Sequence, residues 1–177
     1  LFCVNTGEPI SFQTERVEWN PVMAEKQGYK HFMMKEIHEQ PDVIRNTIGT
    51  RTSEEQGEIL LEDIGIDSAR ARSLNRIVIT ACGTAYYAGL VGKYLLEKAG
   101  QIPVDIDLAS EFRYRDPILD ENTLVIAVSQ SGETADTLAA IDLAKQKGAH
   151  TLGIINVKGS TMTRKVNGTL YIHAGPE

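Results

Sequence analysis

Hydrophobic positions are arranged differently in the two parts of the chain, and the pattern changes at about residue 75. From there onward, short unbroken apolar runs rich in β-branched residues alternate with stretches in which apolar residues recur at helical spacing. Such runs are typical of strands buried on both faces of a parallel sheet, and the spaced residues are typical of amphipathic helices. The expected strands are residues 76–81, 103–108, 124–128, 150–156 and 169–173, and the expected helices are residues 84–99, 160–165 and a stretch that begins at 135. These elements predict an α/β fold with a parallel sheet of about five strands and helices on both faces.

Finer features refine the layout of this α/β part. Gly100 is expected to end the first helix as the residue just past its last turn, where glycine is favoured. Charged residues alternate with apolar ones in residues 103–108, which predicts that this strand lies nearer an edge of the sheet. Residues 109–114 follow it as a loop or a short helix.

The part of the chain before residue 75 has other elements. Residues 1–20 hold short β-like pieces around the turn-forming residues 5–9, and this pattern predicts a hairpin. A lone hairpin is only marginally stable, so we expect it to pair with a further domain. Residues 23–74 are expected to form a polar helical connector that lies against the α/β part. Pro41 is expected to open a second helix within it, because proline is tolerated in a first turn.

The hydroxyl-rich turn at residues 129–134 is the first candidate for chemistry. It follows an apolar strand and opens a helix, whose first backbone N–H groups lack helical partners and carry partial positive charge. Ser129, Ser131 and Thr134 add hydroxyl donors, and Gly132 lets the backbone approach a ligand closely. No lysine follows, so this turn is not the phosphate loop of nucleotide-binding proteins. It predicts a small phosphate monoester held by neutral donors; the alternative is that Ser131 or Thr134 only caps the helix.

A second turn, at residues 82–85, has the same setting, because it also follows an apolar strand and opens a helix. Ligands of parallel α/β sheets bind beyond the carboxyl ends of the strands, at the point where the strand order reverses. We therefore expect the two turns to hold one small polyol phosphate together, one by its phosphate and the other by its hydroxyl groups.

Other reactive side chains give weaker signals. Cys82 has no identifiable general base beside it, so we expect a small residue that fits a turn and not a nucleophile. Ser131 does not belong to a hydrolase nucleophile elbow, because Ser129 stands where that motif has its first glycine. For Glu111 and Arg113 three outcomes are open: pairing with each other, contact across an interface, or a solvated loop.

Neither a metal nor a nucleotide cofactor is expected. The four histidines have no metal-binding spacing, and His173, at the end of the last expected strand, is expected to be structural. The glycine-rich fingerprint of dinucleotide binding is absent.

Composition narrows the class of protein. A length of 177 residues allows one domain, with or without an appendage, and 42% hydrophobic and 24% charged residues are ordinary for a soluble globular protein. A net charge of -6 argues against nucleic acid as a ligand.

Two cysteines far apart in the sequence predict a reduced, cytoplasmic protein. No stretch is apolar enough to span a membrane. The chain begins without methionine and stops after an expected strand, which suggests a piece of a larger protein.

Several motifs resemble one protein family. They are similar to the isomerase part of the glutamine–fructose-6-phosphate aminotransferases and to the helix that leads into it, and the resemblance covers residues 29–177. The matching segments are residues 32–41, 81–84, 109–115, 129–137 and 174–177.

This resemblance implies a fold and a domain order. The family builds its isomerase part from tandem sugar isomerase (SIS) domains, which are flavodoxin-like three-layer αβα units. It implies that residues 1–28 are the end of a glutaminase domain and its linker, residues 29–74 the helical connector, and residues 75–177 the first SIS domain, cut after its last strand. The glutaminase domain and the second SIS domain are then absent partners from the same polypeptide, and a homodimer is expected.

The resemblance also assigns binding residues. Those implied to hold the substrate phosphate are Ser129, Gln130, Ser131 and Thr134, and those implied to hold the sugar are Thr84 and its neighbours Cys82, Gly83 and Ala85. Ala85 departs from family members that have serine there, and this removes a hydroxyl donor worth about 1 kcal/mol as a net hydrogen bond.

In the family, the whole enzyme hydrolyses glutamine with an N-terminal cysteine, passes the ammonia to fructose 6-phosphate and isomerises the product to glucosamine 6-phosphate. The groups that open the sugar and move protons belong to segments that are not in this sequence. The resemblance therefore implies a chain without catalytic residues or a cofactor, which binds fructose 6-phosphate or glucosamine 6-phosphate and turns over neither. Two alternatives remain: a non-catalytic sugar-phosphate sensor module of a regulator, and another sugar-phosphate isomerase of the SIS group.

Overall fold

The main sheet has five parallel strands in the order β4-β3-β5-β6-β7. The computed structural model describes residues 2–11, 21–49, 51–53 and 57–176 of the chain. The strands are β3 (Arg76–Ala81), β4 (Val104–Leu108), β5 (Thr123–Ser129), β6 (His150–Ile155) and β7 (Gly168–Tyr171). The predicted parallel sheet is confirmed, and each strand begins and ends within about two residues of its expected bounds.

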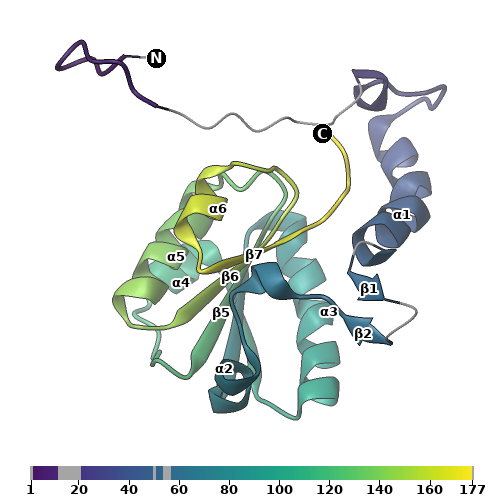
Figure 1. Ribbon diagram of the computed structural model, residues 1–177. Helices are drawn as coiled ribbons and strands as arrows, with labels where there is room; N and C mark the ends of the chain where they lie inside the picture. The colour runs from purple at the N-terminus through teal and green to yellow at the C-terminus, as the bar shows by residue number, and fades with distance from the viewer. Residues whose placement is uncertain (1, 12–20, 50, 54–56, 177) are drawn as a thin grey trace.

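Helices cover both faces of this sheet and complete the expected three-layer α/β architecture (Figure 1). One face packs against α3 (Gly83–Gly100) and the segment around η2 (Glu62–Ile64). The other face packs against α4 (Ala109–Tyr114), α5 (Ala135–Gln146) and α6 (Thr161–Lys165). The short helices η1 (Pro21–Ala24) and α2 (Ser68–Ser73) lie earlier in the chain, before the first strand of the sheet.

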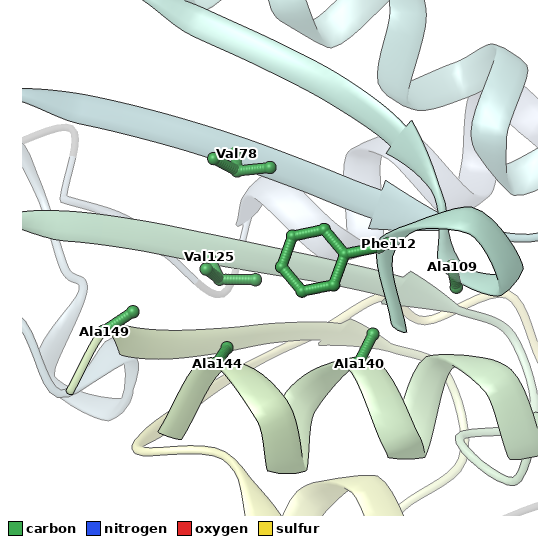
Figure 2. Close-up of a cluster of buried hydrophobic side chains, with 7 residues drawn as sticks. All are labelled: Val78, Ala109, Phe112, Val125, Ala140, Ala144 and Ala149. Atoms are coloured by element: carbon green, nitrogen blue, oxygen red, sulfur yellow. The ribbon is translucent and has the colours of Figure 1, made fainter. Parts of the chain in front are cut away.

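Small side chains let α5 approach the sheet closely. Ala140 and Ala144 of α5 are fully buried in one apolar cluster with Val125 of β5 (Figure 2). The ring of Phe112, on α4, is also fully buried and lies beside Val78 and Val125. Burying such a ring stabilises a fold by about 1.5–3 kcal/mol. This packing fixes where α5 begins relative to the end of β5.

β4 lies at an edge of the sheet, as its alternating charges predicted. Its carboxylates are paired, because Asp105 accepts a hydrogen bond from Arg76 Nε at 2.8 Å and Asp107 accepts one from Arg115. Charged side chains on an edge strand oppose pairing with the edge of another sheet. The charged residues Asp105 and Asp107 therefore suit the position of β4 at the edge of the sheet.

The helix before the α/β part corrects one prediction. α1 (Phe32–Gly49) is a single helix with Pro41 inside it, so the expectation that Pro41 opens a second helix is wrong. Proline has no N–H to donate to the carbonyl of Ile37 and crowds the preceding turn. The residues on both sides nevertheless keep the helical conformation.

A short antiparallel ribbon replaces part of the expected helical connector. It pairs β1 (Thr52–Ser53) with β2 (Glu58–Ile59). Gly57, with a φ of 64°, makes the turn, and its N–H donates to the carbonyl of Ser53 at 2.8 Å. This φ suits glycine, which has no Cβ to clash in the left-handed region.

The predicted N-terminal hairpin is present in a short form. Phe2 and Pro9 form an isolated antiparallel bridge, and the N–H of Cys3 donates to the carbonyl of Glu8 at 2.8 Å. The β-like pieces were expected at residues 1–4, 10–12 and 17–19. Residues 1, 12 and 17–19 lie outside the described residues, and Ile10 and Ser11 are not in a strand.

The end of α3 differs by one residue from the prediction. Gly100 is still helical, and Gln101 takes the left-handed conformation with a φ of 49°. The Gln101 N–H donates to the carbonyl of Glu97, and its side-chain amide donates to the carbonyl of Lys98, both at 3.0 Å. These bonds satisfy carbonyls that the helix leaves open at its end. Gln101 therefore takes the role expected of glycine.

α1 lies beside the α/β part and not on a face of its sheet (Figure 1). It contacts the segment that follows β7, where the N–H of His173 donates to Thr47 Oγ1 at 3.1 Å. Several of its apolar side chains are exposed, among them Phe32 and Met33. Within the connector, α1 thus contacts residues near the C-terminal end, and the segment around η2 packs on the sheet.

Candidate functional site

The two turns singled out in the sequence lie side by side at the carboxyl ends of β3 and β5. These strands are adjacent and parallel, with Ala81 opposite Val128, so Cys82 and Ser129 are the next residues on neighbouring strands. The chain runs from β3 to β4 on one side and then returns to β5 on the other, which makes the crevice between β3 and β5 the switch point of the sheet. Ligands of open α/β sheets bind at such a point.

Hydroxyl groups organise the turn between β5 and α5. Ser129 Oγ accepts a hydrogen bond from the N–H of Gly132 at 3.0 Å and lies 3.4 Å from Thr134 Oγ1. Ser131 Oγ accepts a hydrogen bond from the N–H of Glu133 at 3.2 Å. The oxygens of Ser129 and Ser131 thus serve as acceptors inside the turn. The Ser129–Thr134 contact uses the hydrogen of one of its two hydroxyls, so the other hydroxyl and that of Ser131 keep a hydrogen to donate.

The start of α5 is left uncapped by its own side chains. Thr134 occupies the N-cap position, but its side chain makes no capping hydrogen bond. Ser131 bonds to Glu133, which precedes the helix. The alternative that these hydroxyls only cap α5 is therefore not what the structure shows. The first N–H groups of the helix and its dipole point toward the turn, and both favour an anion there.

One cavity of about 280 Å³ joins the two turns. It is lined by Cys82, Gly83, Thr84, Ala85, Val128, Ser129, Gln130, Ser131 and Thr134. All binding residues expected from the sequence thus line one space, and Val128 is the addition. The lining contains no Lys, Arg, His, Asp or Glu, so the polar groups that face a ligand here are neutral.

The turn is held from behind by the loop between β6 and α6. The carbonyl of Gln130 accepts hydrogen bonds from the N–H groups of Asn156 at 3.2 Å and Val157 at 3.3 Å. The Glu133 carboxylate accepts one from the N–H of Thr161 at 2.7 Å, and this bond is the main cause that lowers the pKa of Glu133. Sequence reasoning missed this support, because nothing local links residues so far apart in the chain.

Gly132 is needed for a reason other than the expected one. Its φ is 68°, and a Cβ placed on it would lie 2.2 Å from Ser160 Oγ and 2.7 Å from Ser160 Cβ. The close approach that glycine permits is therefore to the neighbouring loop. Ser160 Oγ itself is buried and has no hydrogen-bond partner among the described residues.

Of the remaining candidates from the sequence, Arg113 and His173 lie outside the cavity, and Cys82 lines it. Arg113 pairs with Asp136 of α5 at 2.8 Å, which raises the pKa of its guanidinium; this contact is none of the three outcomes left open for Glu111 and Arg113. His173 is exposed and lies beyond the end of β7. It does not line this cavity. Cys82 Sγ accepts a hydrogen bond from Thr137 Oγ1 at 3.8 Å.

The described residues provide neither a metal-ion cluster nor a membrane-spanning helix. No group of three or more His, Cys, Asp or Glu side chains is placed to hold a metal ion. No described helix is both long and apolar enough to cross a membrane.

A second, larger cavity adjoins the first through Gln130. Its volume is about 540 Å³, and it lies between α1 and the segment after β7. It is lined by Ala24, Phe32, Lys35, Glu36, Glu39, Gln40, Val43, Gln130, Ala174, Gly175 and Pro176. Gln130 is the residue that lines both cavities.

A parallel sheet with a cavity at its switch point is the arrangement of an open α/β domain that binds a ligand beyond the carboxyl ends of its strands. Residues 72–177 match the family model of the SIS domain. The chain therefore belongs to the SIS domain family.

Among its relatives are several enzymes named glutamine–fructose-6-phosphate aminotransferase (isomerizing). The protein from Symbiobacterium thermophilum is 53% identical over 171 residues, which are 97% of this chain and 28% of the relative. The protein from Clostridium acetobutylicum is 52% identical over 176 residues, or 99% of this chain and 29% of the relative. The family resemblance carried by the sequence motifs is thus confirmed, and the chain spans less than a third of the length of these relatives.

A solved structure agrees with this assignment. The C-terminal domain of glucosamine-fructose-6-phosphate aminotransferase from Francisella tularensis has a TM-score of 0.77 and 39% sequence identity. The match covers 86% of this chain and 42% of that one.

The contact between Gly132 and Ser160 predicts a specific stability difference. Gly148 is a matched control, because its φ of 83° is also positive but nothing lies within 4 Å of a Cβ placed there. Gly148→Ala is expected to lower the free energy of unfolding by about 1–2 kcal/mol, the cost of a left-handed L-residue. Gly132→Ala adds overpacking, worth about 1–3 kcal/mol more.

Urea unfolding of both variants measures the difference. Equal losses of stability in the two variants would show that the turn does not press against Ser160 as the structure has it.

Proposed function

We propose that this chain is the sugar-phosphate-binding first SIS domain of a glutamine–fructose-6-phosphate aminotransferase, and that its ligand is fructose 6-phosphate or glucosamine 6-phosphate. The observation that carries the proposal is the cavity at the switch point, whose walls are the uncapped start of α5 and the hydroxyls of Ser129, Ser131 and Thr134. Relatives that share about half of its residues carry the name of this enzyme. That name favours the proposal over a sensor module or another SIS-type isomerase.

Each turn has its own part in the proposed binding. The phosphate lies at the start of α5, where the N–H groups of the first turn and the hydroxyls of Ser131 and Thr134 donate to its oxygens. The Gln130 amide adds a donor at the edge of the cavity. The turn that starts α3 faces the phosphate turn across the cavity, and there Thr84 donates to or accepts from the hydroxyl groups of the sugar.

The whole protein is proposed to contain more than this binding domain. We assign residues 1–28 to the end of a glutaminase domain and its linker, residues 29–74 to a connector, and residues 75–177 to the first SIS domain. A glutaminase domain and a second SIS domain in the same polypeptide then supply the ammonia and the proton-transferring groups. The chain covers 28–29% of its relatives, which supports the presence of further domains in the polypeptide. We propose that the complete protein works in the cytoplasm as a homodimer.

Loss of one phosphate donor tests the site. Thr134→Val keeps the shape of the side chain and removes its hydroxyl. A hydrogen bond to a charged group is worth about 1.5–3 kcal/mol, so the dissociation constant for fructose 6-phosphate is expected to rise about tenfold to a hundredfold in titration calorimetry. Thr52→Val, on the exposed ribbon strand β1, is the matched control and is expected to bind like the unchanged chain. Equal affinity in all three proteins would contradict the proposed phosphate position.

Restoring the serine that family members have at position 85 tests the sugar side. Ala85 lines the cavity and Ala88, one turn further along α3, is exposed and does not. Ala85→Ser is expected to strengthen fructose 6-phosphate binding by up to about 1 kcal/mol, or about fivefold, through one added hydrogen bond. Ala88→Ser is expected to change nothing. A gain for both variants, or for neither, would argue against a ligand next to Ala85.

The isolated chain is expected to bind without turning over. The cavity has no carboxylate, imidazole or amine among its lining side chains, so no general acid or base of that kind faces the ligand. Incubation with fructose 6-phosphate and either glutamine or ammonia is expected to give no glucosamine 6-phosphate by chromatography, while the Thermus thermophilus relative serves as the positive control. Synthesis of the product by this chain alone would overturn the proposal that it only binds.

A further inference from the structure

Asn156 is a buried polar residue that sequence reasoning did not single out. It follows the last residue of β6 and is 4% exposed. A buried amide is costly unless its donors and acceptors are paired. The bonds that it makes are therefore informative about its role.

The backbone of Asn156 holds the phosphate turn. Its N–H and that of Val157 both donate to the carbonyl of Gln130, at 3.2 and 3.3 Å. Two donors on one carbonyl fix the peptide that links Gln130 to Ser131. Gln130 and Ser131 both line the cavity that is proposed to hold the ligand.

The side chain of Asn156 holds the segment after β7. Its Nδ2 donates to the carbonyl of Gly175 at 2.6 Å, and its Oδ1 accepts from the N–H of Ala174 at 2.9 Å. An asparagine side chain that bonds both a carbonyl and an N–H of another segment replaces a strand partner for that segment. Ala174 and Gly175 are thereby fastened directly after the sheet ends.

The two segments that Asn156 holds are walls of neighbouring cavities. Gln130 lines the smaller cavity and the larger one, while Ala174 and Gly175 line only the larger one, opposite α1. Asn156 itself lines neither cavity. It is placed to fix both walls without touching a ligand.

We propose that Asn156 is a positioning residue that couples the phosphate turn to the segment at residues 174–175. This inference rests on the proposed sugar-phosphate binding. When a phosphate ester binds, the peptide after Gln130 is held more rigidly, and the shared hydrogen bonds pass this restraint to Ala174 and Gly175. By linkage, a firmly held segment at 174–175 favours binding by the same factor.

Hydrogen exchange of the Ala174 amide tests this coupling, with calorimetric titration of fructose 6-phosphate into the same 177-residue chain. In the unchanged chain, saturating fructose 6-phosphate is expected to slow that exchange about fivefold or more, the lower end of typical coupling between sites. In Asn156→Ala the slowing is expected to disappear, and the dissociation constant is expected to rise about fivefold.

Thr47→Val is the matched control for this experiment. It removes the acceptor of the His173 N–H, next to the coupled segment, and leaves the bonds from Asn156 to Ala174 and Gly175 in place. It is expected to keep both the affinity and the ligand-dependent slowing. If Asn156→Ala does not fold, NMR spectroscopy of the unchanged chain tests the coupling instead. The side-chain amide signals of Asn156 in a nitrogen-correlated spectrum are expected to shift as fructose 6-phosphate binds.

The outcomes separate the two proposals. Binding of fructose 6-phosphate without any change at Ala174 or at the Asn156 amide overturns the coupling and leaves the proposed function intact. Retention of the affinity and the slowing in Asn156→Ala also overturns the coupling. Absence of binding to the unchanged chain overturns the proposed function, and the coupling falls with it.

Discussion

The parallel pairing of β3 with β5 is the constraint on which the site depends. Because Ala81 lies opposite Val128, the turns that follow the two strands meet at the same height above the sheet. A shift of this register by two residues would separate them by about 7 Å, since a strand rises about 3.3 Å per residue. The apolar layers on both faces hold the register, and α5 can begin beside the turn because its buried alanines pack closely on β5.

The site is built from neutral groups that are already in place. The hydroxyls of Ser129 and Ser131 accept hydrogen bonds from N–H groups of their own turn. The carbonyl of Gln130 accepts from the loop after β6, and that of Gly132 accepts from the N–H of Met162 in α6. Little is left to reorganise when a ligand arrives, and binding to a preorganised site costs less conformational entropy. With no cationic side chain in the lining, attraction for a phosphate comes from the helix start and from oriented dipoles.

Local patterns were enough to predict the part of the fold that recognises the proposed ligand. The strands of the sheet are apolar runs buried on both faces, and such runs are visible without any knowledge of their neighbours. The two turns were recognisable because each combines small or hydroxyl-bearing residues with a strand before and a helix after. The rule that ligands bind at the carboxyl ends of parallel strands then placed them together, and the shared cavity agrees.

Tertiary contacts decided what the local pattern left open. α1 continues through Pro41, Gln101 takes the place expected of glycine, and Arg113 pairs with Asp136 of another helix instead of with Glu111. The sequence by itself determined the order of elements and the chemistry of the turns, because hydrophobic spacing and turn residues act over a few positions. Only the tertiary structure decided that Asn156 supports Gln130, because that contact joins residues that follow two different strands, and their separation along the chain carries no signal of their distance in space.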